Sequence, residues 1–262
     1  MQSINQISTI SIIGSGNVAT ALGLAFTQSG LRVIEVFSPN IANSKLLSLR
    51  IGCNYVDDIE MLNPNSDLYI IATPDKEVSN VSLKINIGNG IVVHTSGSEP
   101  ISVFSKYSKN YGVFYPLQTF TVGSVVNLKS VPVCIEGSNK KTVELLEQLA
   151  NRVSDNVVVI DSKQRQLLHL SAVMVNNFTN YFYDVAHSIL HENKIDFELL
   201  HPLIKETANK IGKVIPGDAQ TGPARRNDVH TINRHLELLK KHPEYSNMYH
   251  LISNQIIKKY HD

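Results

Sequence analysis

Hydrophobic residues follow two different patterns along the chain, and the change falls near Asp161. Before this point, short runs rich in Val and Ile alternate with stretches long enough to form a helix. The apolar runs are continuous, as in strands of a parallel sheet that is covered by helices on both faces. The predicted strands are Ile10–Ile13, Arg32–Phe37, Asp67–Ala72, Gly90–His94, Tyr111–Phe114, Pro132–Ile135 and Val157–Ile160. The alternation predicts a doubly wound α/β domain.

After Asp161, apolar residues recur with a period of about 3.6 residues, which is typical of amphipathic helices. The predicted helices are Lys163–His191, Phe197–Ile215, Asp228–Lys241 and Pro243–Tyr260, with one long loop at Pro216–Asn227. Asp228 is expected to cap the third helix and Pro243 to occupy the first turn of the fourth. A further amphipathic helix, Asn139–Asn151, precedes the last strand. We therefore expect an α/β domain at residues 1–161 and an all-helical domain at 162–262.

Composition and charge exclude several classes of partner. The 24 Lys and Arg residues balance 23 Asp and Glu residues, giving a net charge of +1 without a long basic tract, so we expect no nucleic-acid partner. No apolar run approaches the roughly 18 residues of a membrane span, and no charged-then-apolar leader begins the sequence. We expect a cytoplasmic protein without a membrane partner. Cys53 and Cys134 lie in apolar segments, which predicts buried free thiols rather than a disulfide or a metal site.

A glycine-rich turn follows the first predicted strand. The segment Gly14-Ser-Gly-Asn-Val-Ala19 has the spacing GxGxxA and opens a helix-compatible stretch. Gly14 permits the tight turn, Gly16 lets a pyrophosphate approach the backbone, and Ala19 lets the helix pack closely on the sheet. The pyrophosphate of a dinucleotide would lie at the helix N-terminus. The alternative is a glycine turn without a ligand. The candidate cofactor residues are Gly14, Ser15, Gly16, Asn17 and Val18.

The end of the second strand bears on the choice of dinucleotide. NAD-binding proteins place an Asp or Glu there to hold the ribose 2′-hydroxyl, but the tip reads Val36-Phe-Ser-Pro-Asn40 and has no acid. Glu35 lies earlier and is expected to point elsewhere. Ser38, with Lys45 or Arg50 nearby, suits a 2′-phosphate. NADP is therefore favoured over NAD, and the alternative is an ordinary turn.

Two more strands end in polar loops, Thr73-Pro-Asp75 and His94-Thr-Ser-Gly-Ser98. In an open parallel sheet, ligands bind outside the carboxyl ends of the strands. We therefore expect these loops to lie beside a nicotinamide, with a structural role as the alternative for the histidine. The candidate residues are Thr73, Pro74, His94, Thr95 and Ser96.

The order GSGNVA, ATPD and HTSGS, followed by helices, resembles the NADP-linked reductases that include pyrroline-5-carboxylate reductase, prephenate dehydrogenase and the β-hydroxyacid dehydrogenases. HTSGS, the YPLQTF run at Tyr115–Phe120 and the TGPARRNDVHTINRHL run at Thr221–Leu236 resemble, more closely, a bacterial family that couples a Rossmann-like domain to a C-terminal domain of unknown function. The resemblance implies an NADP-dependent oxidoreductase without an assigned substrate. It also implies a helical domain like that of 6-phosphogluconate dehydrogenase, through which two chains form a homodimer.

The first helix after Asp161 carries candidate catalytic residues. His169, Val173, Asn176 and Asn180 fall on one face at helical spacing. In the β-hydroxyacid dehydrogenases that this chain resembles, the long helix carries a Lys and an Asn that orient and protonate the substrate. This chain has Asn176 and Asn177 but no Lys there, and His169 is the candidate replacement as proton donor. The alternative is that His169 and Asn176 form buried structural hydrogen bonds.

The loop Thr221–Asp228 contains the pair Arg225 and Arg226, whose guanidinium groups suit an anionic substrate. The alternative is a solvated surface or a salt bridge to Asp228. His230 and His235 are spaced by five residues, which does not fit a zinc pair, so no metal is expected.

Taken together, these features predict a hydride transfer between NADP and a small, anionic carbonyl, imine or hydroxyl substrate. The other hypothesis is a dinucleotide-binding sensor or regulatory protein that has no turnover.

Overall fold

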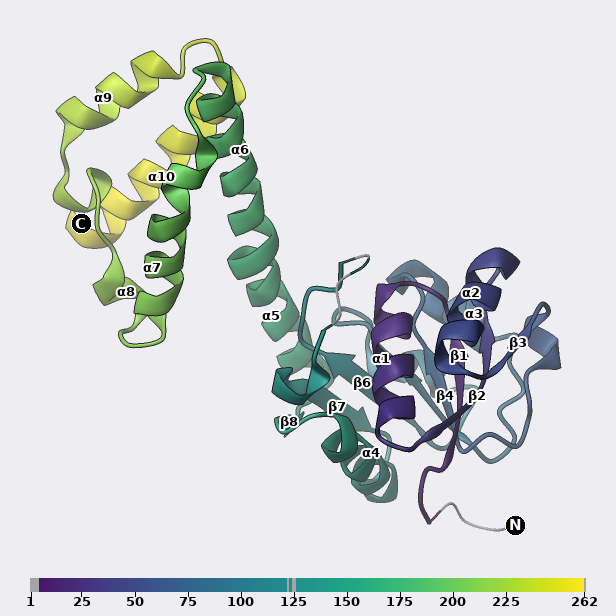
Figure 1. Ribbon diagram of the computed structural model, residues 1–262. Helices are drawn as coiled ribbons and strands as arrows, with labels where there is room; N and C mark the ends of the chain where they lie inside the picture. Colours follow the sequence, from purple (N-terminus) through teal and green to yellow (C-terminus); the bar gives the residue numbers. More distant parts are fainter. Residues whose placement is uncertain (1–4, 122, 124–125, 262) are drawn as a thin grey trace. The chain divides into compact units, whose positions relative to one another are not determined.

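The computed structural model describes residues 5–121, 123 and 126–261. The chain divides after Asn177 into two compact units (Figure 1). The strands of the first unit are β1 (Thr9–Ile13), β2 (Arg32–Phe37), β3 (Asn54–Val56), β4 (Leu68–Ile71), β5 (Ile91–His94), β6 (Tyr111–Pro116), β7 (Val133–Gly137) and β8 (Val157–Val159). They form one sheet in the order β3-β2-β1-β4-β5-β6-β7-β8. All neighbouring strands are parallel except β6 and β7. The predicted doubly wound α/β fold is confirmed.

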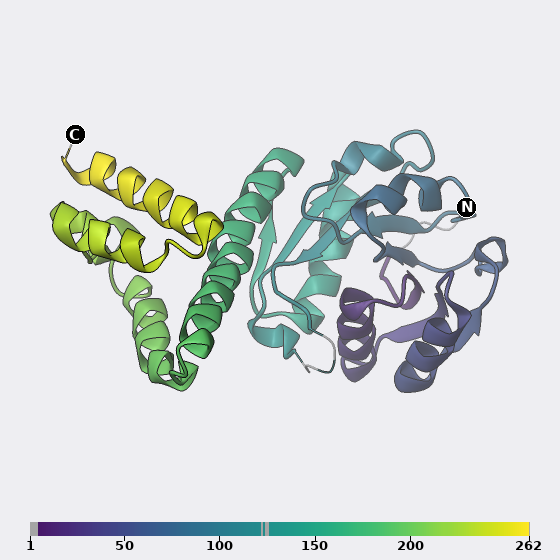
Figure 2. The same cartoon turned by 90° about the horizontal axis from the view of Figure 1, so that it is seen from above.

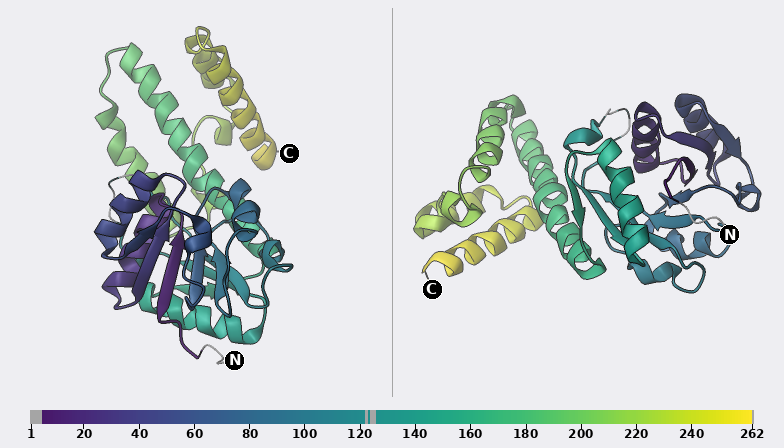
Figure 3. Two further views of the ribbon diagram at one scale, coloured as in Figure 1. Left: turned by 90° about the vertical axis from the view of Figure 1, so that its right-hand side faces the viewer. Right: turned by 90° about the horizontal axis from the view of Figure 1, so that it is seen from below.

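Helices cover both faces of this sheet, as Figures 2 and 3 show. One face packs against α1 (Asn17–Gln28), α2 (Ile41–Ile51) and α4 (Lys140–Val153). The other packs against α3 (Val78–Ser82) and the 3-10 turns at Ile59–Met61 and Ile101–Phe104. Every residue of β4 and of β5 is buried, because both faces of these central strands are covered. Their continuous apolar sequences follow from that position.

Strand order sets where a ligand can bind. Chain connections run outward from β1 in one direction to β2 and β3, and in the other to β4, β5 and β6. The loops that leave β1 and β4 therefore diverge at the carboxyl edge of the sheet. Such a switch point leaves a crevice in which doubly wound proteins bind their ligands.

The first helix after the sheet is capped by Asp161, whose carboxylate accepts a hydrogen bond from the backbone N–H of Gln164 at 2.8 Å. It continues as α5 (Ser162–Ala172), a π-helical segment (Val173–Phe178) and α6 (Thr179–Glu192). The sequence predicts a single α-helix over this span. The helix is confirmed, but the wider π-helical turn within it is not predicted. The division between the two units falls within that turn.

The second unit is helical, as the sequence predicts. Its other helices are α7 (His201–Ile211), α8 (Pro216–Ala219), α9 (Val229–Leu238) and α10 (Pro243–His261). Asp228 caps α9 by accepting a hydrogen bond from the backbone N–H of Thr231 at 3.0 Å, and α10 begins at Pro243, so both predicted helix starts are confirmed. None of the helices described here is long and apolar enough to cross a membrane.

Both cysteines are free thiols, as predicted. Cys134 is buried and Cys53 is half-buried. Burial, with a smaller effect from Glu35, raises the pKa of Cys53 to about 11, and burial also raises the pKa of Cys134. Neither thiol is therefore activated as a nucleophile.

Candidate active site

The turn from β1 into α1 has the geometry that its two glycines predict. Gly14 has a φ of +119°, and a Cβ added to it would lie 2.3 Å from the carbonyl oxygen of Ala72, just beyond β4. Gly16 is the N-cap of α1, and a Cβ added there would meet nothing within 4 Å. Among the residues that the structure describes, no side chain forms a capping hydrogen bond with the N-terminus of α1. The helix N-terminus therefore presents its N–H groups to open space, where they can bind an anion.

A cavity of about 730 Å³ opens at this turn, at the carboxyl ends of β1, β4, β5 and β6. All of its described lining residues belong to the first unit. They include the glycine turn, the ends of β4, β5 and β6, and the helix after Asp161. From the candidate residues of the sequence, the lining contains Gly16, Asn17, Val18, Thr73, Pro74, Thr95, His169, Asn176 and Asn177.

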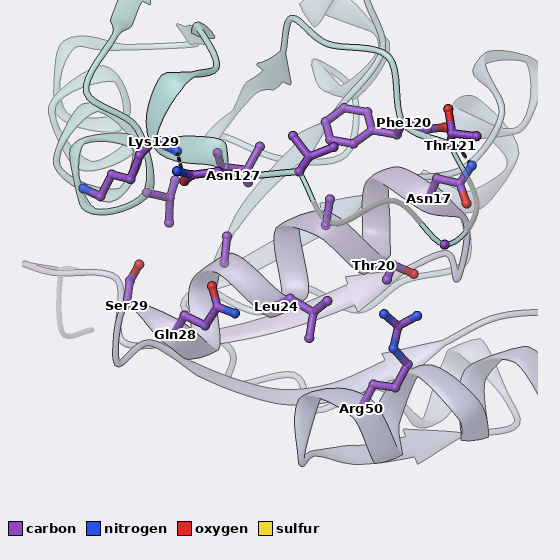
Figure 4. Close-up of a pocket in the computed structure, with 16 residues that line it drawn as sticks. Asn17, Thr20, Leu24, Gln28, Ser29, Arg50, Phe120, Thr121, Asn127 and Lys129 are labelled. Atoms are coloured by element: carbon purple, nitrogen blue, oxygen red, sulfur yellow. Dashed lines mark hydrogen bonds between the residues drawn. The ribbon is translucent and has the colours of Figure 1, made fainter.

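A smaller cavity of about 390 Å³ runs along α1 (Figure 4). Thr20 and Gln28 line it from α1, Arg50 from the last turn of α2, and Lys129 from the opposite wall. Asn17 lines both cavities, and its side-chain amide donates a hydrogen bond to the carbonyl oxygen of Phe120 at 2.8 Å. None of the other candidate site residues lines this second cavity, so the larger one is the candidate site.

The end of β2 is joined to the glycine turn by a hydrogen bond of 2.8 Å from the hydroxyl of Ser15 to that of Ser38. Glu35 is turned into the protein interior, where it accepts hydrogen bonds from the hydroxyl of Ser11 at 2.6 Å and the backbone N–H of Asn63 at 2.8 Å. It therefore leaves the strand tip free of negative charge. On α2, the ammonium of Lys45 lies 5.1 Å from the ring centre of Tyr55.

His94 lies behind the cavity wall. Its side chain is fully buried, its ring packs on Phe104 at 5.5 Å, and its Nδ1 accepts a hydrogen bond from the backbone N–H of Ser96 at 3.2 Å. Burial, assisted by the charge of Arg165, lowers the pKa of His94 to about 3. The imidazole is therefore neutral at physiological pH. Thr95, one residue later, lines the cavity instead.

Ser96 shapes the loop that follows β5. Its hydroxyl accepts hydrogen bonds from the backbone N–H groups of Ser98 at 3.1 Å and Glu99 at 2.9 Å. The hydroxyl of Ser98 in turn donates to the carboxylate of Asp75, in the loop after β4. Ser96 is thus a loop-building residue outside the cavity lining.

Tyr115, His169 and two consecutive asparagines are among the polar residues of the cavity wall. The hydroxyl of Tyr115 lies 2.9 Å from Nδ1 of His169. Asn176 and Asn177 are consecutive, and both line the cavity from the π turn, in which residues are spaced more widely than in an α-helix. Asn180, which helical spacing places on the same stripe, is outside the lining.

The sequence analysis does not select two further residues, Tyr115 in the cavity wall and Arg165 behind it. Tyr115 ends a parallel strand, so the rule that selected Thr73 and His94 selects it too. Arg165 is fully buried one turn before His169 and pairs with the carboxylate of Glu136. It also donates to the carbonyl oxygen of Glu99, which fixes α5 to the loop after β5. A lone arginine on an amphipathic helix gives no sequence signal for this burial.

The arginine pair lies in the second unit, outside the described cavity lining. The guanidinium of Arg225 lies over the ring of Tyr260 at 4.1 Å. Arg226 is exposed, and hydrogen bonds from Thr231, with a smaller effect from Arg226, lower the pKa of Asp228. In the part of the chain that the structure covers, no cluster of three His, Cys, Asp or Glu residues has metal-binding geometry.

Family models match both parts of the chain. Residues 3–117 match a Rossmann-like domain, and residues 131–256 match a domain of unknown function, DUF2520. A search of curated proteins finds no match.

Solved structures match nearly the whole chain. A protein from Bacteroides fragilis, named a "putative NADP oxidoreductase", is 35% identical, with a TM-score of 0.89 and coverage of 96% of this chain and 98% of its own. Protein TM1727 from Thermotoga maritima is 20% identical, with a TM-score of 0.71 and coverage of 95% and 97%. An imine reductase from Myxococcus stipitatus in complex with NADP+ is 15% identical, with a TM-score of 0.74 and coverage of 97% and 95%.

The two less similar structures share the fold of this chain. The identity and coverage of the Bacteroides protein establish a closer relationship, and they agree with the two family models. This chain belongs to the family in which a Rossmann-like domain is joined to the DUF2520 domain.

Proposed function

We propose that this protein is an NADP-dependent reductase or dehydrogenase that transfers a hydride between the nicotinamide and a small carbonyl, imine or hydroxyl substrate. The observation that carries the proposal is a single cavity that contains both the uncapped N-terminus of α1 and the titratable side chain of His169. A phosphate-binding element and a proton donor beside the same space are the two things that such a reaction requires of the protein.

The residues around the turn fit the cofactor. The open space above Gly16 admits a pyrophosphate, and the N–H groups of Asn17 and Val18 lie in the first turn of α1. Thr73, Pro74 and Thr95 line the neighbouring part of the cavity. The hydroxyl oxygen of Thr73 is buried without a hydrogen-bond partner among the described residues, so it is free to bond a ligand. We place the nicotinamide beside these three residues.

The end of β2 supports NADP over NAD. Residues 36–46 contain no Asp or Glu, and Glu35 is held in the interior by Ser11 and Asn63. A carboxylate at this position would repel a 2′-phosphate, and its absence removes the usual partner of the NAD ribose. Ser38 and the backbone N–H groups in the first turn of α2 that the side chain of Asn40, its N-cap, leaves free can bind the phosphate oxygens.

His169 is the proposed proton donor in the direction of reduction. The cofactor, when bound, supplies the hydride that forms a new C–H bond at the substrate carbon. The electron pair of the C=O or C=N bond then takes a proton from protonated His169, whose N–H bond breaks, and water later restores that proton. Asn176 and Asn177 orient the substrate by hydrogen bonds from their side-chain amides.

The substrate's charge is a further point. The described lining of the cavity contains apolar, hydroxyl, amide and imidazole groups, but no Lys, Arg, Asp or Glu side chain. An anionic substrate group would therefore need a cation from elsewhere in the protein. Arg225 and Arg226 stay the predicted partners, and neutralising them should raise KM for an anionic substrate without affecting a neutral one.

A matched pair of glycine variants tests the cofactor site. Gly16→Ala adds a methyl group to open space, so it should cost at most about 1 kcal/mol of stability while weakening NADPH binding at least tenfold. Gly14→Ala forces a side chain into a backbone with positive φ and against the Ala72 carbonyl. It should destabilise the fold by about 1–3 kcal/mol or more.

Fluorescence titration with NADPH and NADH, together with thermal unfolding, measures both effects. Wild-type protein should bind NADPH more tightly than NADH. Tight NADPH binding by Gly16→Ala, or no binding of either nucleotide by the wild type, would contradict the cofactor assignment.

A further inference from the structure

We infer that Tyr115 is a positioning residue that acts through His169. Gly97 contacts the other side of the imidazole, and together the two residues fix the ring so that Nε2 is the nitrogen that exchanges a proton in the cavity. The kinetic consequences of this inference rest on the proposed reductase function, whereas the hydrogen bond itself does not.

Two features of the first unit enclose the His169 ring. The hydroxyl of Tyr115 engages Nδ1 at 2.9 Å, and the two rings meet nearly edge to face, with centres 5.9 Å apart and an angle of 78°. On another side, the imidazole lies directly against Gly97. A Cβ added to Gly97 would be 2.5 Å from both Cγ and Nδ1 of His169. The ring therefore cannot turn toward the loop.

Both supports are themselves held in place. Tyr115 belongs to β6, is only 9% exposed, and pairs with Cys134 of β7. Gly97 lies between Ser96, which accepts two backbone hydrogen bonds of its own loop, and Ser98, which bonds Asp75. The Arg165 guanidinium joins the same loop to α5 through the carbonyl oxygen of Glu99. A misplaced ring would thus require the movement of a strand or of the loop.

The chemistry of the pair assigns different tasks to its members. Burial, with smaller effects from Cys134 and Asp75, raises the pKa of Tyr115 to about 12. The phenol therefore keeps its proton at physiological pH and does not act as the acid. It donates to Nδ1 in the neutral tautomer that carries its proton on Nε2, and it accepts from Nδ1–H in the other neutral tautomer and in protonated His169. In each of these states Nδ1 is occupied, and none of the described residues bonds Nε2.

This arrangement leaves Nε2 for the substrate. Protonated His169 gives its Nε2 proton to the substrate heteroatom while the Nδ1–H bond to Tyr115 is retained. In the reverse direction, the neutral tautomer with its proton on Nδ1 accepts a second proton at Nε2 from a hydroxyl or amine. The contribution of Tyr115 is therefore the orientation of the ring, and misplacement of a catalytic group by about 1 Å can reduce the rate by about 100-fold.

A double-mutant cycle distinguishes this role from simple packing. Tyr115→Phe retains the ring and removes the hydroxyl, so it should lower kcat by 10- to 100-fold and leave KM for NADPH unchanged. In a His169→Gln background the same substitution should have little further effect, because Tyr115 acts only through His169. Gly97→Ala should likewise lower kcat in the wild-type background and have little further effect in the His169→Gln background. Tyr111→Phe removes a hydroxyl from the other end of β6 and should leave kcat unchanged.

Nitrogen NMR of the protein without cofactor supplies a second measurement. At a pH at which His169 is neutral, its Nδ1 resonance should have the shift of a hydrogen-bonded acceptor. Tyr115→Phe should move this resonance toward the value of an unbonded nitrogen, and Tyr111→Phe should not. His169→Gln identifies the signal by its loss.

The two measurements separate failure of this inference from failure of the proposed function. An unchanged Nδ1 resonance in Tyr115→Phe, or a loss of kcat that is equally large with and without His169, would overturn the inference while leaving the reductase in place. A protein that shows the NMR change but has no turnover with any substrate would retain the Tyr115–His169 pair and overturn the function.

Discussion

His94 and Thr95 are adjacent, but only Thr95 lines the cavity. Strand alternation turns successive side chains to opposite sides, so a strand end selected from sequence identifies the right loop but not the right residue. Thr73 and Thr95 follow their strands and line the cavity, whereas His94 is still within β5 and packs on Phe104. At the end of β5, the sequence pattern therefore identifies the correct loop, and the residue that lines the cavity is the one directly after the histidine.

The burial of His94 predicts a pH-dependent stability. Its pKa is about 3 in the folded protein and near 6.5 in an unfolded chain. The unfolded chain thus binds more protons below about pH 6.5, and this contribution to stability, complete above that pH, is lost as the pH falls toward 3. The slope reaches at most about 1.4 kcal/mol per pH unit.

His94→Asn checks this prediction, because the amide oxygen can still accept the hydrogen bond from Ser96. Urea unfolding followed by circular dichroism between pH 7 and pH 4 should show a shallower loss of stability for the variant than for the wild type. His230→Asn, at an exposed position, should follow the wild-type curve. Parallel curves for His94→Asn and wild type would show that this imidazole is not held neutral.

At the scale of helices and strands, the burial of an element determines how well the sequence pattern predicts it. Central strands such as β4 are covered on both faces and are readily recognised. The edge strand β3 has three residues, two of them exposed, and gives almost no signal. The pattern also does not define the bounds of helix α2, since its exposed face carries Leu46 and Leu49, which weaken the amphipathic pattern.

The π turn explains the remaining difference in the site. A stripe at α-helical spacing joins His169 to Asn176 and Asn180. The turn at Val173–Phe178 is wider, so Asn177 joins Asn176 on the cavity wall and Asn180 does not. Sequence patterns based on a fixed helical period cannot foresee such a turn, although π turns are frequent at functional sites.

At the scale of the whole molecule, the second unit buries few of its own side chains. Among residues 178–261 the buried ones are Val185, Ala224, Ile232, Leu239 and Ser253. Leu199, Leu203 and Ile211 are spaced along one face of α7 and its preceding turn, and they are 71%, 62% and 51% exposed. Apolar faces of this kind are commonly covered by a partner. The homodimer expected from the family resemblance stays a prediction that this exposure supports.

Light scattering tests the dimer. The wild type should have about twice the chain mass of 29.1 kDa, and Leu203→Glu should shift it toward the monomer because a buried unpaired carboxylate is strongly unfavourable. Leu49→Glu, at an 81% exposed position of the first unit, is the matched control and should leave the mass unchanged. A monomeric wild type would refute the prediction.

The central claim is that the cavity transfers a hydride, and isotope transfer tests it most directly. NADPH deuterated at the reactive carbon is incubated with a panel of small carbonyl and imine compounds, neutral and anionic, and products are analysed by mass spectrometry. We predict deuterium on the carbon of at least one product, with kcat lowered about 10²- to 10⁴-fold in His169→Gln and unchanged in His187→Gln, an exposed residue of the second unit. NADPH binding without deuterium transfer to any compound would contradict the account and indicate a non-catalytic dinucleotide sensor.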